Sequence, residues 1–178
     1  MRHEIRISGF GGQGVVLAGY LLGKALSLYL DLEAVMTQSY GPEARGGASS
    51  SNIVVADRSI AYPFVQKADV FIALSQEGYS RYRDETVPEA KVLIDSGLVT
   101  PRTDDQVFAI NATELAEGLG RRIVANVVML GFLCGTTDIV TYEALQKAIQ
   151  TTVKEGVIPL NLQALELGLE QAQREGVA

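Results

Sequence analysis

The stretch HEIRISGFGGQG, residues 3–14, decides the fold of this chain. Ile5 and Ile7 alternate with polar residues, which predicts a short strand over residues 3–8. The glycine-rich segment GFGGQG follows at residues 9–14. An apolar run from Val15 to Leu30 then predicts a buried helix. A strand, a Gly-x-Gly-x-x-Gly turn and a helix in this order indicate the first unit of a layered α/β domain.

The rest of the chain extends this pattern. Five further strands are predicted at residues 32–38, 51–56, 69–74, 91–94 and 106–110, with a helix at 76–83. Four helices are predicted at residues 113–119, 121–134, 142–153 and 161–174, the first opening at Thr113 as in a capping box. The sequence therefore predicts a single domain over residues 1–178. We expect an α/β, Rossmann-like three-layer fold with a mostly parallel sheet and a helical C-terminal third.

Composition excludes several classes of function. The 178 residues include one cysteine, Cys134, and one histidine, His3, with a net charge of −6. The chain alone therefore cannot supply an internal disulfide, a cysteine-held iron–sulfur cluster or a multi-histidine zinc site. The acidic balance argues against nucleic-acid binding. The run Val15–Leu30 is shorter than the about 20 apolar residues that span a bilayer, so we expect no membrane segment and a cytoplasmic location.

The glycine loop is the first candidate binding site. Glycines permit close backbone approach, and the following helix presents free N–H groups to an anion. The alternative is a turn that merely packs tightly. Dinucleotide binding would need an acidic residue at the end of the second strand, where Thr37, Gln38 and Ser39 stand instead. This departure weakens a plain NAD hypothesis.

A second loop, TQSYGPEARGG at residues 37–47, is predicted to leave the second strand at the same sheet edge. Arg45 beside two glycines suits a phosphate or carboxylate, and Ser39 and Tyr40 add hydroxyls. A surface turn with Arg45 paired to Glu43, or an interface loop, is equally compatible. Asn126, in an apolar helix, is expected to hold a loop backbone, or less often to reach a ligand or a partner. The pair Arg121-Arg122 could meet an anion, but such a pair more often marks a solvated helix start.

Three motifs together carry a specific resemblance. GFGGQG at residues 9–14, SYGPEARGG at 39–47 and NVVMLG at 126–131 resemble the gamma subunit of the 2-oxoacid:ferredoxin oxidoreductases. The resemblance implies an enzyme that decarboxylates a 2-oxoacid on thiamine diphosphate, reduces ferredoxin through iron–sulfur clusters and makes an acyl-CoA. In that family the gamma part is Rossmann-like, packs beside the thiamine-bearing parts and helps to bind or cover CoA.

The resemblance also implies how the work is divided among chains. This chain has no GDG…N motif and no cysteine set, so alpha and beta subunits would hold thiamine diphosphate, Mg and the clusters. A small ferredoxin-like chain is a further candidate partner, and ferredoxin is the electron acceptor. The cofactor-binding candidates, for contact with CoA, are Gly9, Gly11, Gly12, Gln13, Gly14, Ser39, Tyr40, Gly41, Arg45, Gly46 and Asn126.

Other hypotheses stay open at this point. The resemblance implies a 2-oxoacid as the substrate of the enzyme, with 2-oxoglutarate slightly preferred over pyruvate, branched-chain 2-oxoacids and indolepyruvate. A stand-alone NAD(P)-binding oxidoreductase and a purely structural subunit are the alternatives from other classes. We expect the isolated chain to be inactive and to self-associate to cover its apolar interface.

Overall fold

A computed structural model describes residues 1–40 and 47–175. Its centre is a six-stranded sheet of order β2-β3-β1-β4-β5-β6. The strands are β1 (Arg2–Phe10), β2 (Glu33–Ser39), β3 (Ala48–Ala56), β4 (Ala68–Ala73), β5 (Thr86–Asp95) and β6 (Phe108–Ile110). Each of the six predicted strands is therefore present, with shifted ends.

The sheet is mixed but mostly parallel. β1 pairs with β4, β4 with β5 and β5 with β6 in parallel, whereas β3 runs antiparallel to both β1 and β2. The predicted fold class is confirmed, but the reversed direction of β3 was not anticipated. Its reason is chain length: a parallel crossover needs about a dozen residues or more, and fewer separate Ser39 from Ala48.

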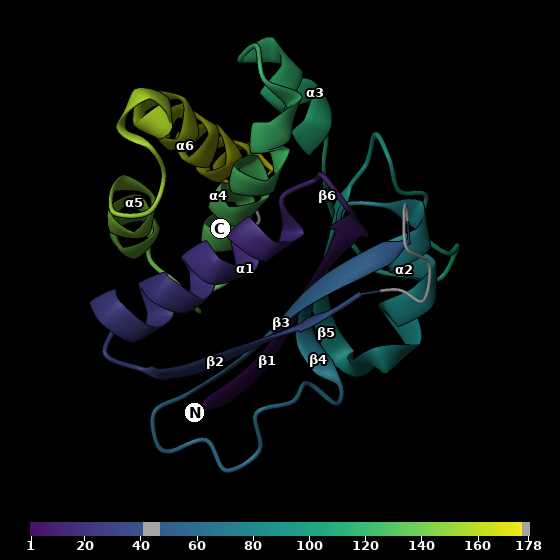
Figure 1. The fold of residues 1–178 in the computed structure, drawn as a ribbon. Coiled ribbons are helices and arrows are strands. Elements are labelled where there is room, and N and C mark those ends of the chain that lie inside the picture. The colour runs from purple at the N-terminus through teal and green to yellow at the C-terminus, as the bar shows by residue number, and fades with distance from the viewer. Residues whose placement is uncertain (41–46, 176–178) are drawn as a thin grey trace.

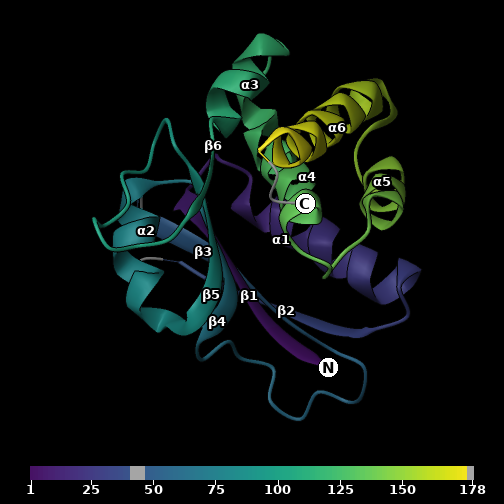
Figure 2. The same cartoon turned by 180° about the vertical axis from the view of Figure 1, so that it is seen from behind.

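The helices cover the two faces of the sheet unequally (Figures 1 and 2). The helices α1 (Val15–Lys24), α4 (Ala125–Thr136), α5 (Tyr142–Gln150) and α6 (Ile158–Arg174) lie on one side, and α2 (Gln76–Tyr82) lies on the other. The short α3 (Ala112–Gly118) follows β6. A π-helical turn, η1 (Ala25–Tyr29), extends α1, and three 3₁₀ turns, η2 (Arg83–Glu85), η3 (Arg122–Val124) and η4 (Glu155–Val157), join other elements. Within the described parts of the chain, no helix combines the length and apolarity that crossing a bilayer requires.

Each face of the sheet has its own apolar core. On the α1 side, Ile5 and Ile7 of β1 pack with Leu21 and Leu22 of α1, all at most 1% exposed. On the α2 side, Phe71 of β4 packs in a smaller cluster around α2. The period of two along the strands places successive side chains on opposite faces, so both cores follow from the strand pattern.

Helices α4 and α6 are in very close contact. A Cβ atom built on Gly131 would lie 1.9 Å from the Leu165 carbonyl oxygen, and one built on Gly168 would lie 1.9 Å from the Val128 carbonyl oxygen. No side chain fits at either position. Gly131, which ends the NVVMLG motif, therefore serves helix packing.

The prediction of a wholly buried first helix was wrong. Val16, Leu17 and Tyr20 of α1 are 37%, 36% and 51% exposed, and Leu28 in the following turn is 66% exposed. The sequence shows apolar residues on most sides of the helix, but the described residues cover the side that faces the sheet, α4 and α5 and leave these side chains exposed.

Candidate functional site

The glycine loop connects β1 to α1 and depends on two unusual backbone conformations. Gly12 has φ 92° and Gly14 has φ 70°, in the left-handed region that favours glycine. A Cβ atom on Gly14 would lie 2.4 Å from Asn126 Nδ2, whereas none on Gly11 or Gly12 would meet a heavy atom within 4 Å. The loop is thus tight at Gly14 and open at its tip.

Gln13 fastens the loop to the neighbouring strand. Its Oε1 accepts a hydrogen bond from the Phe10 N–H (2.6 Å), and its Nε2 donates to the Leu74 carbonyl just after β4 (2.7 Å). Both ends of the amide are therefore used within the protein. This side chain shapes the loop, besides lining the pocket described below.

Asn126 holds the other end of the loop. The side chain is 2% exposed, and its Nδ2 donates to the Gly14 carbonyl (3.0 Å) while its Oδ1 accepts from the Val127 N–H (2.9 Å). This contact agrees with the loop-holding interpretation of Asn126. It ties the start of α4 to the start of α1 across 112 residues of sequence.

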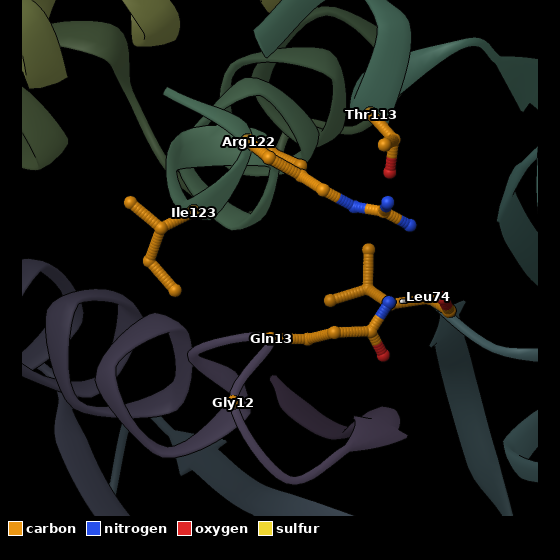
Figure 3. A pocket seen from close by; sticks show the side chains of 7 residues that line it. Gly12, Gln13, Leu74, Thr113, Arg122 and Ile123 are labelled. Atoms are coloured by element: carbon orange, nitrogen blue, oxygen red, sulfur yellow. Dashed lines mark hydrogen bonds between the residues drawn. The ribbon is translucent and has the colours of Figure 1, made fainter. Parts of the chain in front are cut away.

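A pocket of about 250 Å³ opens beside the loop tip. Gly12 and Gln13 form one side of it, and the other lining residues are Leu74, Thr113, Arg122, Ile123 and Ala125. Figure 3 shows the Arg122 side chain crossing the pocket, with its guanidinium between Thr113 and Leu74. Among the described residues, the nearest carboxylate oxygen, on Glu117, lies 3.7 Å from Arg122, and both side chains are more than half exposed. So weak a pair leaves the guanidinium available to an anion.

Thr113 is set in place by a buried carboxylate at the end of β5. Asp95 is fully buried, and its Oδ2 accepts from the N–H (3.0 Å) and the hydroxyl (2.6 Å) of Thr113. Its Oδ1 accepts from the Gly97 N–H (3.1 Å). The predicted capping role of Thr113 was wrong, because its hydroxyl proton goes to Asp95 and α3 begins after Asn111. The hydroxyl oxygen of Thr113 keeps acceptor capacity.

Only part of the second loop can be placed. Gly41, Arg45 and Gly46 lie outside the described residues. Ser39 ends β2 and pairs with Ser50 of β3, which in turn pairs with Ser8 of β1. Ser39 is therefore two strands, roughly 10 Å, from the residue before the glycine loop. β2 does end at the predicted sheet edge, but β3 stands between the two loops.

Tyr40, the next candidate, is 68% exposed, and its hydroxyl donates to Gln38 Oε1 (2.5 Å). The structure thus brings together the glycine loop, Gln13 and Asn126, and adds Leu74, Thr113 and Arg122. The sequence had marked Thr113 as the opening of a helix, and the Arg121-Arg122 pair as a solvated helix start that could also meet an anion. Leu74 had no functional signal in the sequence.

Cys134, the one cysteine of the chain, does not line this pocket. Burial, and to a lesser extent Glu143, raise the pKa of the Cys134 thiol to about 12, and its Sγ donates to the Val140 carbonyl (3.3 Å). A thiol that stays protonated at neutral pH is not a nucleophile. In residues 1–40 and 47–175, no group of three or more His, Cys, Asp or Glu side chains is arranged to hold a metal ion.

Comparison with known proteins identifies the family. The family model described as "Pyruvate ferredoxin/flavodoxin oxidoreductase" matches residues 4–171. The 2-oxoglutarate synthase subunit KorC of Methanocaldococcus jannaschii is 48% identical over 178 residues, covering 97% of this chain and 95% of that protein.

Two solved structures share the fold. The gamma subunit of a keto/oxoacid ferredoxin oxidoreductase from Geobacter sulfurreducens has a TM-score of 0.89 and 39% identity, covering 98% of both chains. A 2-oxoglutarate:ferredoxin oxidoreductase from Magnetococcus marinus, solved with 2-oxoglutarate, coenzyme A and succinyl-CoA, has a TM-score of 0.87 at 23% identity. There the match covers 97% of this chain and 31% of that chain. The chain therefore belongs to the pyruvate ferredoxin/flavodoxin oxidoreductase family, as a gamma subunit of a 2-oxoacid:ferredoxin oxidoreductase.

Proposed function

We propose that this chain serves an oxidoreductase that acts on 2-oxoglutarate, and that its glycine loop and Arg122 contact CoA in that enzyme. The name of the 48% identical relative supports the substrate. The observation that carries the CoA contact is the pocket in which the loop tip and an unconstrained guanidinium face each other.

The groups around this pocket fit a phosphate-bearing ligand. Among the described residues, the N–H groups of Gly11 and Gly12 have no hydrogen-bond partner, and α1 adds the positive end of its dipole. Arg122 offers a planar fork of donors to phosphate oxygens. The Thr113 oxygen offers an acceptor to an N–H group, of the kind that the amide-containing arm of CoA carries.

The remaining chemistry belongs to other chains in this proposal. Alpha and beta subunits hold thiamine diphosphate, Mg and the iron–sulfur clusters, a ferredoxin-like chain completes the assembly, and ferredoxin accepts the electrons. The lone cysteine of this chain supports that division and a cytoplasmic location.

Steady-state kinetics of the complete enzyme test the CoA contact. Arg122→Gln removes a charged donor, so we expect the KM for CoA to rise about tenfold while the KM for the 2-oxoacid is unchanged. Arg174→Gln, which alters an exposed arginine at the far end of α6, is the control.

A second pair of variants probes the loop itself. Gly11 has open space around it, so Gly11→Glu and Gly11→Gln have matched size and differ in charge. A site for phosphates predicts a larger rise in the KM for CoA with Glu than with Gln. Unchanged CoA kinetics in Arg122→Gln together with equal effects of the two Gly11 variants would overturn the contact. Arg45→Ala in the same assay tests the second loop.

A further inference from the structure

We propose that the outer face of α1, with the pocket beside it, docks a segment of another subunit that carries a large apolar side chain next to carboxylates. Val16, Leu17 and Tyr20 lie on one side of α1, since residues three and four apart share a helix face. A helix that is apolar all round belongs in an interior. Because this chain leaves that side exposed, another chain must cover it.

A pocket of about 360 Å³ continues this face. It lies between α1, η3, η4 and the start of α6, and Leu17, Ile123, Val124, Val153, Val157 and Leu160 form its apolar walls. Ile123 and Val157 are themselves 50% and 38% exposed. Leu17 belongs both to the exposed side of α1 and to this pocket, so the two apolar areas adjoin, as in the centre of a protein interface.

Three polar groups in the pocket indicate the chemistry of the occupant. Arg121 and Lys154 line it, and neither has a carboxylate at ion-pair distance in the described part of the chain. Asn161 is 6% exposed and donates through Nδ2 to the Val157 carbonyl (2.8 Å), while its Oδ1 has no partner among the described residues.

Among the described residues, every fully buried side-chain polar atom has a hydrogen-bond partner. The Oδ1 atom of Asn161 has none, so it is accessible, and Asn161 lines this pocket. It can accept a hydrogen bond from a peptide N–H. Apolar walls, an acceptor and two cations together suit a polypeptide segment with a large apolar residue beside Asp or Glu.

A second copy of this chain suits the surface less well. In a two-fold dimer the same patch meets itself, which would gather Arg121 and Lys154 of both copies in one interface. The residues that line this pocket include no carboxylate to pair with them. Like charges opposed in an interface are unfavourable. A gamma subunit of this family has other subunits as partners. The charges of the pocket therefore favour one of those subunits as the occupant.

The docked segment would lie next to the pocket proposed for CoA. Ile123 lines both pockets, while Gly14 borders one and Gly12 the other. The docking proposal rests on the family and on this surface, and it stands even if the loop does not touch CoA.

Co-expression of the tagged chain with the other subunits of its enzyme tests the docking. The measured quantity is the fraction of this chain that elutes within the complex in size-exclusion chromatography. We expect Leu17→Asp, and separately Arg121→Glu with Lys154→Glu, to lower that fraction about tenfold. The controls are Tyr62→Asp, at an exposed aromatic residue elsewhere, and Lys67→Glu with Arg81→Glu. Both cations are exposed and have no ion pair within the described residues.

Thermal melts of the isolated variants separate a loss of docking from a loss of folding. If Leu17→Asp is too unstable to interpret, the charge-reversal variant, which changes only surface cations, is the deciding one. Wild-type assembly of the charge-reversal variant would overturn the proposal. So would a result in which both variants abolish self-association of the isolated chain but leave the complex intact. The KM for CoA is a separate readout, so failure of docking and failure of the CoA contact can be told apart.

Discussion

Individual side chains fix the glycine loop at both ends. Gln13 connects the loop to the strand end at Leu74, and Asn126 connects Gly14 to the start of α4. The amides are thereby held by the protein, and the tip at Gly11 and Gly12 stays open. The two side chains therefore position the backbone N–H groups that we propose to contact phosphate.

Gly14→Ala and Gly11→Ala should differ sharply in stability. Alanine at position 14 would adopt a left-handed φ and place its Cβ against Asn126, so we expect a loss of about 1–3 kcal/mol. At position 11 the space is open, and the change should stay within about 0.5 kcal/mol. Urea denaturation of the isolated chain measures both. Equal losses of stability in the two variants would contradict the close contact between Gly14 and Asn126.

Asp105 gives a pH-dependent contribution to stability. Burial opposes its ionisation, but hydrogen bonds from Tyr79 and Arg83 outweigh burial and lower the pKa of Asp105. Asp105→Asn should cost about 1–2 kcal/mol at pH 7. Since the folded-state pKa is the lower one, this contribution is present above the unfolded pKa and is lost as the pH falls through the folded value.

The stability difference between wild type and Asp105→Asn should therefore shrink below about pH 4. Melting temperatures at pH 7 and pH 3 measure it, with the neighbouring exposed Asp104→Asn as the control. A gap that is the same at both pH values would refute the role of the ionised carboxylate.

The sequence pattern located the loop but not all the side chains that serve it. Gly9 to Gly14 follow the first strand, so their position could be predicted from local order alone. The partners of Gln13 and Asn126 are 61 and 112 residues away, and the Asp95–Thr113 contact joins separate elements. Arg122 was visible as a charge, but only the pocket distinguishes it from a solvated arginine.

Among the elements, α4 and α6 depend most on close backbone approach. Gly131, Gly135 and Gly168 lie along their contact, where any added Cβ would meet the facing helix within 2.3 Å. The helical C-terminal third is therefore built around a tight helix pair. One helix of the pair, α4, carries Asn126, which holds the glycine loop.

Gly168→Ala should disrupt that pair. Its Cβ would overlap the Val128 carbonyl of α4, and we expect a loss of at least about 3 kcal/mol. Gly118→Ala, at the end of α3 with no atom within 4 Å, should leave stability unchanged or raise it by up to about 1 kcal/mol. Circular dichroism during chemical denaturation gives both values. A Gly168→Ala protein as stable as Gly118→Ala would contradict the close packing.

Element types were predictable because alternation and apolar runs are local signals. The direction of β3 was not, because it depends on the short connection after Ser39 rather than on the residues of the strand. This detail matters for function, since an antiparallel β3 separates Ser39 from β1. The arrangement also removes the strand end that would hold a ribose in a dinucleotide-binding domain, which argues against the NAD(P) alternative.

At the scale of the molecule, one region gathers the functional features. The glycine loop, the Arg122 pocket and the uncovered face of α1 adjoin one another through Gly14 and Ile123. The resemblance carried by the three motifs predicted a subunit from the sequence, and the missing GDG…N motif and cysteine set agreed with it. The exposed side of α1 became visible only in the structure. Together they support the proposal that this chain completes its site in an assembly.

The most direct test is the activity of the complex purified through a tag on this chain. With 2-oxoglutarate and CoA it should reduce ferredoxin with a kcat/KM at least about tenfold above that for pyruvate, and omission of CoA should stop turnover. The other subunits prepared without this chain should lose CoA-dependent activity. Full activity of those subunits alone, or a preference for pyruvate, would contradict the account.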